Sequence, residues 1–210
     1  MTNANRYAIP AGRHRAELSI ERSRFICTIE RARVPEDVQA FVREMNAEFS
    51  DATHNCWAFV AGPPGSANHL GMSDDGEPHG TAGRPMLTVL THSGVGEIAA
   101  VVTRYFGGTK LGTGGLVKAY SGAVQHALAS LPTVERVDRV DVGLTIAYAN
   151  VSAIQQLLPS FEAEVVDQRF EVDVSLLLRL PATNLERLRA AVADATRGEG
   201  HFAEASNADA

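Results

Sequence analysis

The chain has 210 residues, 45% of them hydrophobic and 21% charged, which is typical of a globular protein with room for one or two domains. Its formal net charge of −6 argues against a protein that coats nucleic acid non-specifically. No apolar run is long enough to span a membrane, and the N-terminus lacks the apolar segment of a secretion signal. We therefore expect a cytoplasmic protein without membrane contact.

The acidic excess is confined to the last part of the chain. Residues 134–210 carry seven basic and thirteen acidic side chains, whereas residues 1–133 carry twelve of each. Residues 1–33 alone hold seven arginines against three acidic residues. An acidic total is therefore compatible with a locally basic surface on the first part of the chain.

Hydrophobic periodicity predicts that the first part of the chain alternates strands with helices in an α+β domain. We expect a mixed sheet with its helices packed mainly on one side. In chain order, the expected elements are a hairpin of Arg15–Ile20 and Arg24–Glu30, a helix from Pro35 to about Phe49, strands at Ala52–Ala61 and Asn68–Met72, a short helix from Pro85, a strand at Ile98–Val102 and a helix that ends near Pro132.

A glycine-rich loop follows the strand at Ile98–Val102 and leads into the next helix. Lys110 and Lys118, the only lysines of the chain, lie in this loop and in the predicted first turn of the helix. Cations at a helix N-terminus favour an anion or nucleic-acid site, although the glycines match neither nucleotide-binding pattern and could serve packing alone. If Gly114 needs a positive φ, Gly114→Val should harm both folding and binding. The candidate anion-binding residues are Arg104, Gly107, Gly108, Lys110, Gly112, Thr113, Gly114, Gly115 and Lys118.

An acidic turn at residues 73–83 is the second candidate for chemistry. Asp74, Asp75 and Glu77 lie within four residues, and their oxygens could hold Mg²⁺ weakly together with a ligand, supply a general base, or simply shape a turn. His54 and Cys56 lie on the same face of the predicted strand. The two could form a catalytic pair, or Cys56 could be a buried thiol beside a hydrogen-bonded histidine. We expect no dedicated metal site and no other cofactor, since no closely spaced cysteine or histidine pair supports one.

The second part of the chain has the pattern β-α-β-β-α-β, the order of ferredoxin-like domains. We expect domains at residues 1–133 and 140–204, joined by a charged linker, and an unstructured tail at 204–210. The expected elements are the linker Pro132–Arg139, a strand at Val140–Tyr148, a helix capped by Asn150, strands at Glu164–Gln168 and Phe170–Leu178, a helix at Pro181–Thr196 and a short strand at Gly200–Ala203.

Three long stretches resemble signatures of the YigZ/IMPACT family, in the family's order. They are ATHNCWAFV at Ala52–Val60, SDDGEPHGTAGRPML at Ser73–Leu87 and VVTRYFGGTKLGTGGLVKAYSGAV at Val101–Val124. The resemblance implies that the N-terminal domain has the fold of the second domain of a ribosomal small-subunit protein. It implies that the C-terminal domain is similar to the last domain of elongation factor G.

The resemblance implies a non-enzymatic cytoplasmic regulator of translation, with a role in stress responses, that binds RNA, the ribosome or a translation factor. The alternative is an enzyme acting on a phosphorylated small molecule or nucleotide, with Asp74, Asp75 and Glu77 facing Arg104 and Lys110 across a cleft. His54 is a further candidate catalytic residue of this enzyme. A third hypothesis is a structural partner that uses the acidic C-terminal domain. A concave pocket shared by the acidic turn and the glycine loop favours the enzyme, and an open convex face favours binding.

Overall fold

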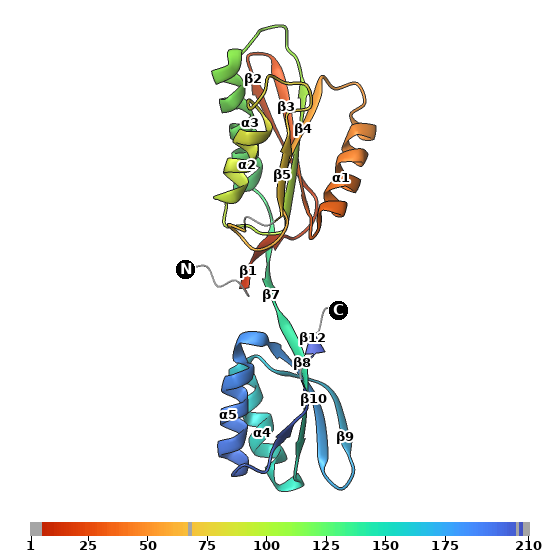
Figure 1. Cartoon of the computed structure of the whole chain (residues 1–210), viewed down its shortest axis with the longest axis vertical. Coiled ribbons are helices and arrows are strands. Elements are labelled where there is room, and N and C mark those ends of the chain that lie inside the picture. The colour runs from red at the N-terminus through yellow and green to blue at the C-terminus, as the bar shows by residue number, and fades with distance from the viewer. Residues whose placement is uncertain (1–5, 67–68, 205, 208–210) are drawn as a thin grey trace. The chain divides into compact units, whose positions relative to one another are not determined.

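The computed structural model describes residues 6–66, 69–204 and 206–207 (Figure 1). The chain divides into two compact units, residues 1–136 and residues 137–210. Within the described residues, no helix combines the length and the hydrophobicity that a membrane crossing requires.

The N-terminal unit is built on a five-stranded sheet with the strand order β2-β3-β6-β4-β5. Every pairing in this sheet is antiparallel. The elements of the unit are β1 (Arg6–Pro10), β2 (His14–Ile20), β3 (Ser23–Arg31), α1 (Pro35–Glu48), β4 (His54–Val60), β5 (Leu70–Ser73), α2 (Gly83–Thr91), β6 (Ile98–Tyr105), α3 (Gly112–Ala129) and β7 (Thr133–Val137).

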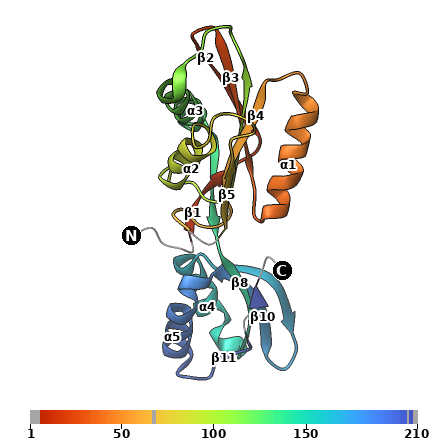
Figure 2. The same ribbon diagram turned by 45° about the horizontal axis from the view of Figure 1, so that its top comes forward.

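The two faces of this sheet are covered by different helices. Helices α2 and α3 pack on one face and α1 on the other, as Figures 1 and 2 show. The α+β class is confirmed, and α2 and α3 share one face as expected, but the sheet is antiparallel rather than mixed and α1 covers its second face. Strand β6 explains why both faces of the sheet are covered by helices. Its residues Ala100 and Val102 point toward α2 and α3, whereas Ala99 and Val101 point toward α1. A central strand that is apolar on both sides needs a helix on each face.

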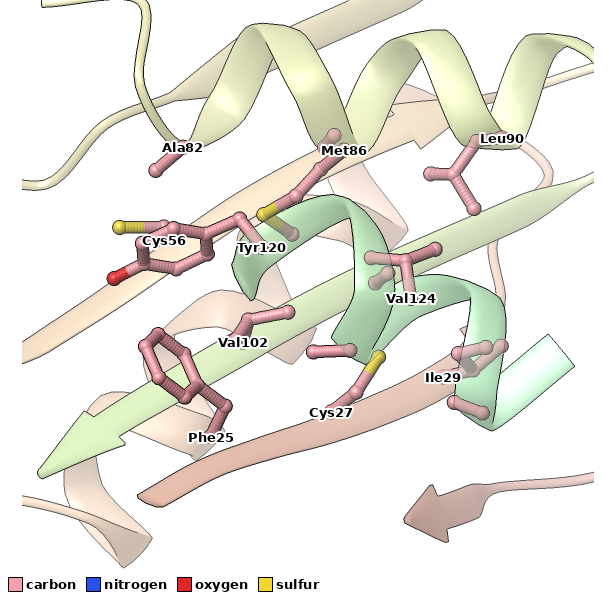
Figure 3. Close-up of a cluster of buried hydrophobic side chains, with 14 of the residues drawn as sticks. Phe25, Cys27, Ile29, Cys56, Ala82, Met86, Leu90, Val102, Tyr120 and Val124 are labelled. Atoms are coloured by element: carbon pink, nitrogen blue, oxygen red, sulfur yellow. The ribbon is translucent and has the colours of Figure 1, made fainter. Parts of the chain in front are cut away.

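The main core lies between the sheet and helices α2 and α3 (Figure 3). The rings of Phe25 and Tyr120 meet edge to face with centroids 5.3 Å apart. Cys27 and Cys56 are free and buried in the same layer, and burial raises the pKa of each thiol to about 12. A thiol with such a pKa is protonated at neutral pH, so Cys56 is not an activated nucleophile beside His54.

The segment expected to be a linker, Pro132–Arg139, is mostly strand. Its residues form β7, which pairs with β1, and β8 begins at Arg139. Two of the charges that suggested a solvated linker have partners in the N-terminal unit, since Glu135 accepts from Arg6 at 3.1 Å and Arg136 reaches the buried Glu97 at 2.6 Å. The pairing therefore depends on distant residues rather than on the local pattern.

The C-terminal unit has the ferredoxin-like strand order β11-β8-β10-β9, and the pairs in it are antiparallel. Helices α4 and α5 cover one face of this sheet, where they pack against the apolar sides of β8 and β10. The elements are β8 (Arg139–Ile146), α4 (Val151–Leu157), β9 (Glu164–Phe170), β10 (Val174–Pro181), α5 (Leu185–Thr196), β11 (His201–Phe202) and β12 (Ser206–Asn207), with short 3₁₀ turns at Tyr148–Asn150, Leu158–Phe161 and Ala182–Asn184.

Three local expectations for this unit are wrong. The hairpin turns at residues 171–173 rather than before Phe170, because the Glu171 N–H bonds to the Asp173 carbonyl, and Val172 at the tip is 92% exposed. Asn150 belongs to a 3₁₀ turn and its side chain caps no helix. In the tail, residues 206–207 form β12 against β8, whereas residues 205 and 208–210 lie outside the described part.

Candidate functional site

A cavity of about 350 Å³ lies in the N-terminal unit where the glycine loop after β6 meets the acidic turn before α2. Strand β4 supplies one wall, the end of β6 another, and the first turns of α3 a third. The lining residues are Thr53, His54, Glu77, Pro78, Arg104, Phe106, Lys110, Leu111, Gly112, Thr113 and Leu116.

Arg104 lies near the end of β6, and its side chain is only 7% exposed. Its guanidinium carbon lies 5.5 Å and 5.6 Å from the ring centroids of Phe25 and Phe106. Nη1 donates to Glu77, but Nε is buried and has no hydrogen-bond partner in the described part of the chain. An unsatisfied buried donor costs about 1–3 kcal/mol, so this nitrogen is an energetically costly feature of the cavity wall.

Glu77 is the carboxylate of the cavity, with a side chain only 3% exposed. Its Oε1 accepts from Arg104 and from the Tyr120 hydroxyl at 2.9 Å. Burial is the main reason that the pKa of Tyr120 lies above its ordinary value, so this hydroxyl remains a donor. Glu77 and Arg104 therefore form a buried ion pair that is fixed from two sides.

His54 faces Arg104 across the β4–β6 pairing and lines the same cavity. Its Nδ1 lies 2.6 Å from the Asp75 carbonyl oxygen, and a carbonyl accepts only, so Nδ1 carries the proton. In the neutral ring Nε2 is then an acceptor, 3.9 Å from Glu77 Oε1. The structure thus gives His54 a defined tautomer with its accepting nitrogen on the cavity side.

The other two carboxylates of the turn are engaged with the backbone and do not line the cavity. Asp74 accepts from the N–H groups of Gly80, Ala82 and Gly83 at 2.7–3.0 Å. Burial opposes ionisation of Asp74, yet these backbone hydrogen bonds hold its pKa below the ordinary value. Asp75 accepts from the Asn55 N–H at 2.6 Å. Of the three carboxylates expected to face Arg104 across a cleft, only Glu77 does so.

The candidate loop residues separate into three groups. Lys110, Gly112 and Thr113 line the cavity, together with Leu111 and Leu116. Helix α3 begins at Gly112 without a capping side chain, so the first-turn amides have no such partner. Lys118 is the seventh residue of α3, beyond the expected first turn, and it is exposed outside the cavity.

The remaining glycines shape the loop in different ways. A Cβ on Gly107 would lie 2.0 Å from the Arg22 carbonyl carbon, so this glycine allows the loop to rest on the β2–β3 turn. Gly108 adopts a φ of +87°, and Gly115 packs against Leu111. Gly114 has no positive φ and open space around its Cβ position, so the condition for a harmful Gly114→Val substitution is not met.

Most of the arginines in residues 1–33 are paired with carboxylates, which reduces the expected basic surface. Arg22, Lys110 and Lys118 form no ion pair with any of the described residues. Arg22 is adjacent to the loop through the contact with Gly107. The paired residues are Arg6 with Glu135, Arg13 with Glu30 and Glu44, Arg15 with Glu48, Arg24 with Glu17 and Arg31 with Glu97.

No group of three or more histidine, cysteine, aspartate or glutamate side chains in the described part of the chain could hold a metal ion. Sequence reasoning missed Tyr120 and Phe106 as parts of the site. Tyr120 follows the apolar stripe of α3, and its bond to Glu77 spans 43 residues of sequence. No local signal marks such a contact.

Comparison with known proteins places these features in a family. The Impact N-terminal domain model matches residues 21–128, and a domain of unknown function (DUF1949) matches residues 144–199. The IMPACT family member YigZ of Escherichia coli (strain K12) is 43% identical over 192 residues, 91% of this chain and 94% of that protein. The chain belongs to the IMPACT family.

Two further comparisons agree with this membership. An IMPACT family member of Haemophilus influenzae is 40% identical over 192 residues, covering 91% of this chain and 93% of that protein. A crystal structure described as that of a hypothetical protein is 42% identical, covers 94% of this chain and 96% of its own, and has a TM-score of 0.65. The similarity therefore extends over most of this chain and most of each of these proteins.

Proposed function

We propose that this IMPACT family member binds single-stranded RNA through the cavity side of its N-terminal unit and acts in cytoplasmic translation without catalysing a reaction. The observation that carries the proposal is the buried, unpartnered Nε of Arg104 beside the uncapped start of α3. A helix N-terminus favours anions, and Lys110 adds a cation at the same rim.

Three cations on or near the glycine loop form no ion pair with the described residues, which favours a polymeric anion as the ligand rather than a single phosphate group. Lys110 lines the cavity, whereas Arg22 lies on the neighbouring hairpin turn and Lys118 on the exposed side of α3. A chain of phosphates needs contacts spread over such a surface, since each neutralised phosphate contributes separately to affinity. The family resemblance implies that both units are similar to domains of translation components, which supports the assignment to translation. The exposed ring of Phe106, on which a base could stack, supports RNA binding.

The second candidate function is an enzyme acting on a phosphorylated small molecule or nucleotide. It is favoured by the concave cavity that Glu77 shares with the glycine loop, and by the accepting Nε2 of His54. Against it, Asp74 and Asp75 are occupied by backbone amides and the Cys56 thiol is protonated at neutral pH. Glu77 and His54 are then the groups of the cavity that remain for acid–base chemistry.

RNA binding across a salt series tests the proposal. A single-stranded RNA oligonucleotide should bind the full chain, and Lys110→Ala/Lys118→Ala should flatten the log–log salt dependence by about 0.7 per lost contact. The matched control is Arg33→Ala/Arg43→Ala, which removes two exposed arginines near helix α1 on the opposite face of the sheet. Equal affinities and slopes for the two double variants would contradict the proposal. Turnover of a nucleotide or phosphorylated sugar by the wild type, lost in Glu77→Gln, would favour the enzyme.

A further inference from the structure

We infer that the cavity receives one unpaired nucleobase of the RNA and reads its edge, with guanine as the preferred base. The inference rests on the proposed RNA-binding function and assigns separate parts of the cavity to the base and to the phosphate. It starts from the uneven distribution of charge and apolar surface over the lining residues.

The charges show where a phosphate would not bind. Glu77 is an almost fully buried carboxylate on the inner wall, so a phosphate placed there would meet a like charge in a poorly solvated position. The start of α3 and Lys110 lie at the outer part of the same cavity, where both favour an anion. The anionic part of the ligand therefore belongs at the rim and its neutral part inside.

The cavity walls between the outer rim and the inner end at Glu77 are mostly apolar and suit a flat ring. Phe106, Leu111, Leu116 and Pro78 line the cavity from the loop, the helix and the acidic turn. The volume of about 350 Å³ lies at the lower end of the range for small-molecule sites, roughly 300–1,000 Å³. A single base fits this description, whereas a continuous stretch of nucleic-acid backbone does not.

The inner end presents two acceptors and a donor. The Glu77 carboxylate and His54 Nε2 are acceptors, and the guanidinium of Arg104, which lines the same wall, is a donor. The Watson–Crick edge of guanine offers the complementary set, two adjacent N–H donors beside a carbonyl acceptor. Adenine, cytosine and uracil each offer one donor group on that edge, so one of the two acceptors would be covered by the base without a hydrogen bond from it.

An edge read in this way must be unpaired. A base inside a duplex has its Watson–Crick edge occupied, and proteins that read this edge bind single strands or extrude the base. The cavity therefore predicts selection for single-stranded RNA with at least one accessible guanine.

The test compares uridine hexamers that carry one guanosine, inosine, adenosine or cytidine at a central position, with guanosine 5′-monophosphate as a separate probe. The guanosine hexamer should bind about fivefold or more tightly than the others, and inosine, which lacks the 2-amino donor, should lose part of the preference. A complementary strand should abolish it. Phe106→Ala should weaken the guanosine preference, and Val134→Ala, at an exposed position on β7 outside the cavity lining, serves as its control.

The outcomes separate this inference from the proposed function. Equal binding of all four hexamers would overturn the base-reading inference and leave RNA binding standing. Binding of the mononucleotide without any hexamer would overturn the RNA proposal and retain the guanine pocket. Absence of binding by every probe would overturn both. A guanosine preference that survives both Phe106→Ala and Glu77→Gln would place base recognition outside the cavity and contradict the inference.

Discussion

Two glycines of the same loop should respond to alanine in opposite directions. Gly107 and Gly114 are indistinguishable by local sequence, but a Cβ on Gly107 would meet the backbone of Arg22 and Ser23 at 2.0–2.4 Å. Since real Cβ atoms do not approach backbone so closely, the loop must move off the hairpin, and overpacking of this kind typically costs about 1–3 kcal/mol. Gly114→Ala adds a methyl into open space within α3, where alanine is favoured over glycine by about 0.5–1 kcal/mol.

The measurement is urea denaturation followed by tryptophan fluorescence. Trp57 is the only tryptophan and lies on β4, so the signal reports the N-terminal unit alone. Gly107→Ala should lower the midpoint and Gly114→Ala should leave it unchanged or raise it, with similar slopes for both. Equal stability of the two variants, or a larger loss for Gly114→Ala, would refute the account of the loop.

Three other changes test the buried polar groups. The pKa of Asp74 is lowered in the folded state, so its stabilisation is present above the ordinary value of 3.8 and is lost as the pH falls through the lower folded value. Acid unfolding of Asp74→Asn, followed by Trp57 fluorescence, should therefore depend less steeply on pH, and an unchanged profile would count against the backbone contacts. Cys27 and Cys56 should resist alkylation by iodoacetamide at pH 7 in the native chain and react once it is unfolded in urea, whereas rapid native modification would show that they are not buried. Glu97→Ala should cost about 1.5–3 kcal/mol in urea denaturation because it removes the buried carboxylate that accepts from Tyr7, Arg31 and Arg136. A loss below about 0.5 kcal/mol would contradict this.

Strong local patterns predicted most of the elements correctly. The apolar run Ile98–Val102 and the stripe after Pro35 correspond to β6 and α1, since burial on both faces and amphipathic spacing each require a particular local structure. Expectations were wrong where partners are distant in sequence. Strand β7 pairs with β1 from the opposite end of the unit, and neither strand is marked by its own residues.

The candidate site was predictable in its position but not in its contacts. The glycine loop and the acidic turn do meet, yet three neighbouring carboxylates look alike in sequence and only Glu77 points into the cavity. The choice depends on the backbone amides of Gly80, Ala82 and Gly83, which engage Asp74, and on that of Asn55, which engages Asp75. The unpartnered Nε of Arg104 follows from three-dimensional packing and has no sequence signature.

The central claim is that single-stranded RNA binds the cavity side of the N-terminal unit. The most direct measurement is a titration of the isotopically labelled full chain with a guanosine-containing RNA hexamer, followed through backbone amide NMR signals. The account predicts salt-sensitive shifts at Arg22, Arg104 and residues 106–118, and unchanged signals in α1 and in the C-terminal unit. Shifts confined to the C-terminal unit, or none at RNA concentrations that saturate binding, would contradict it.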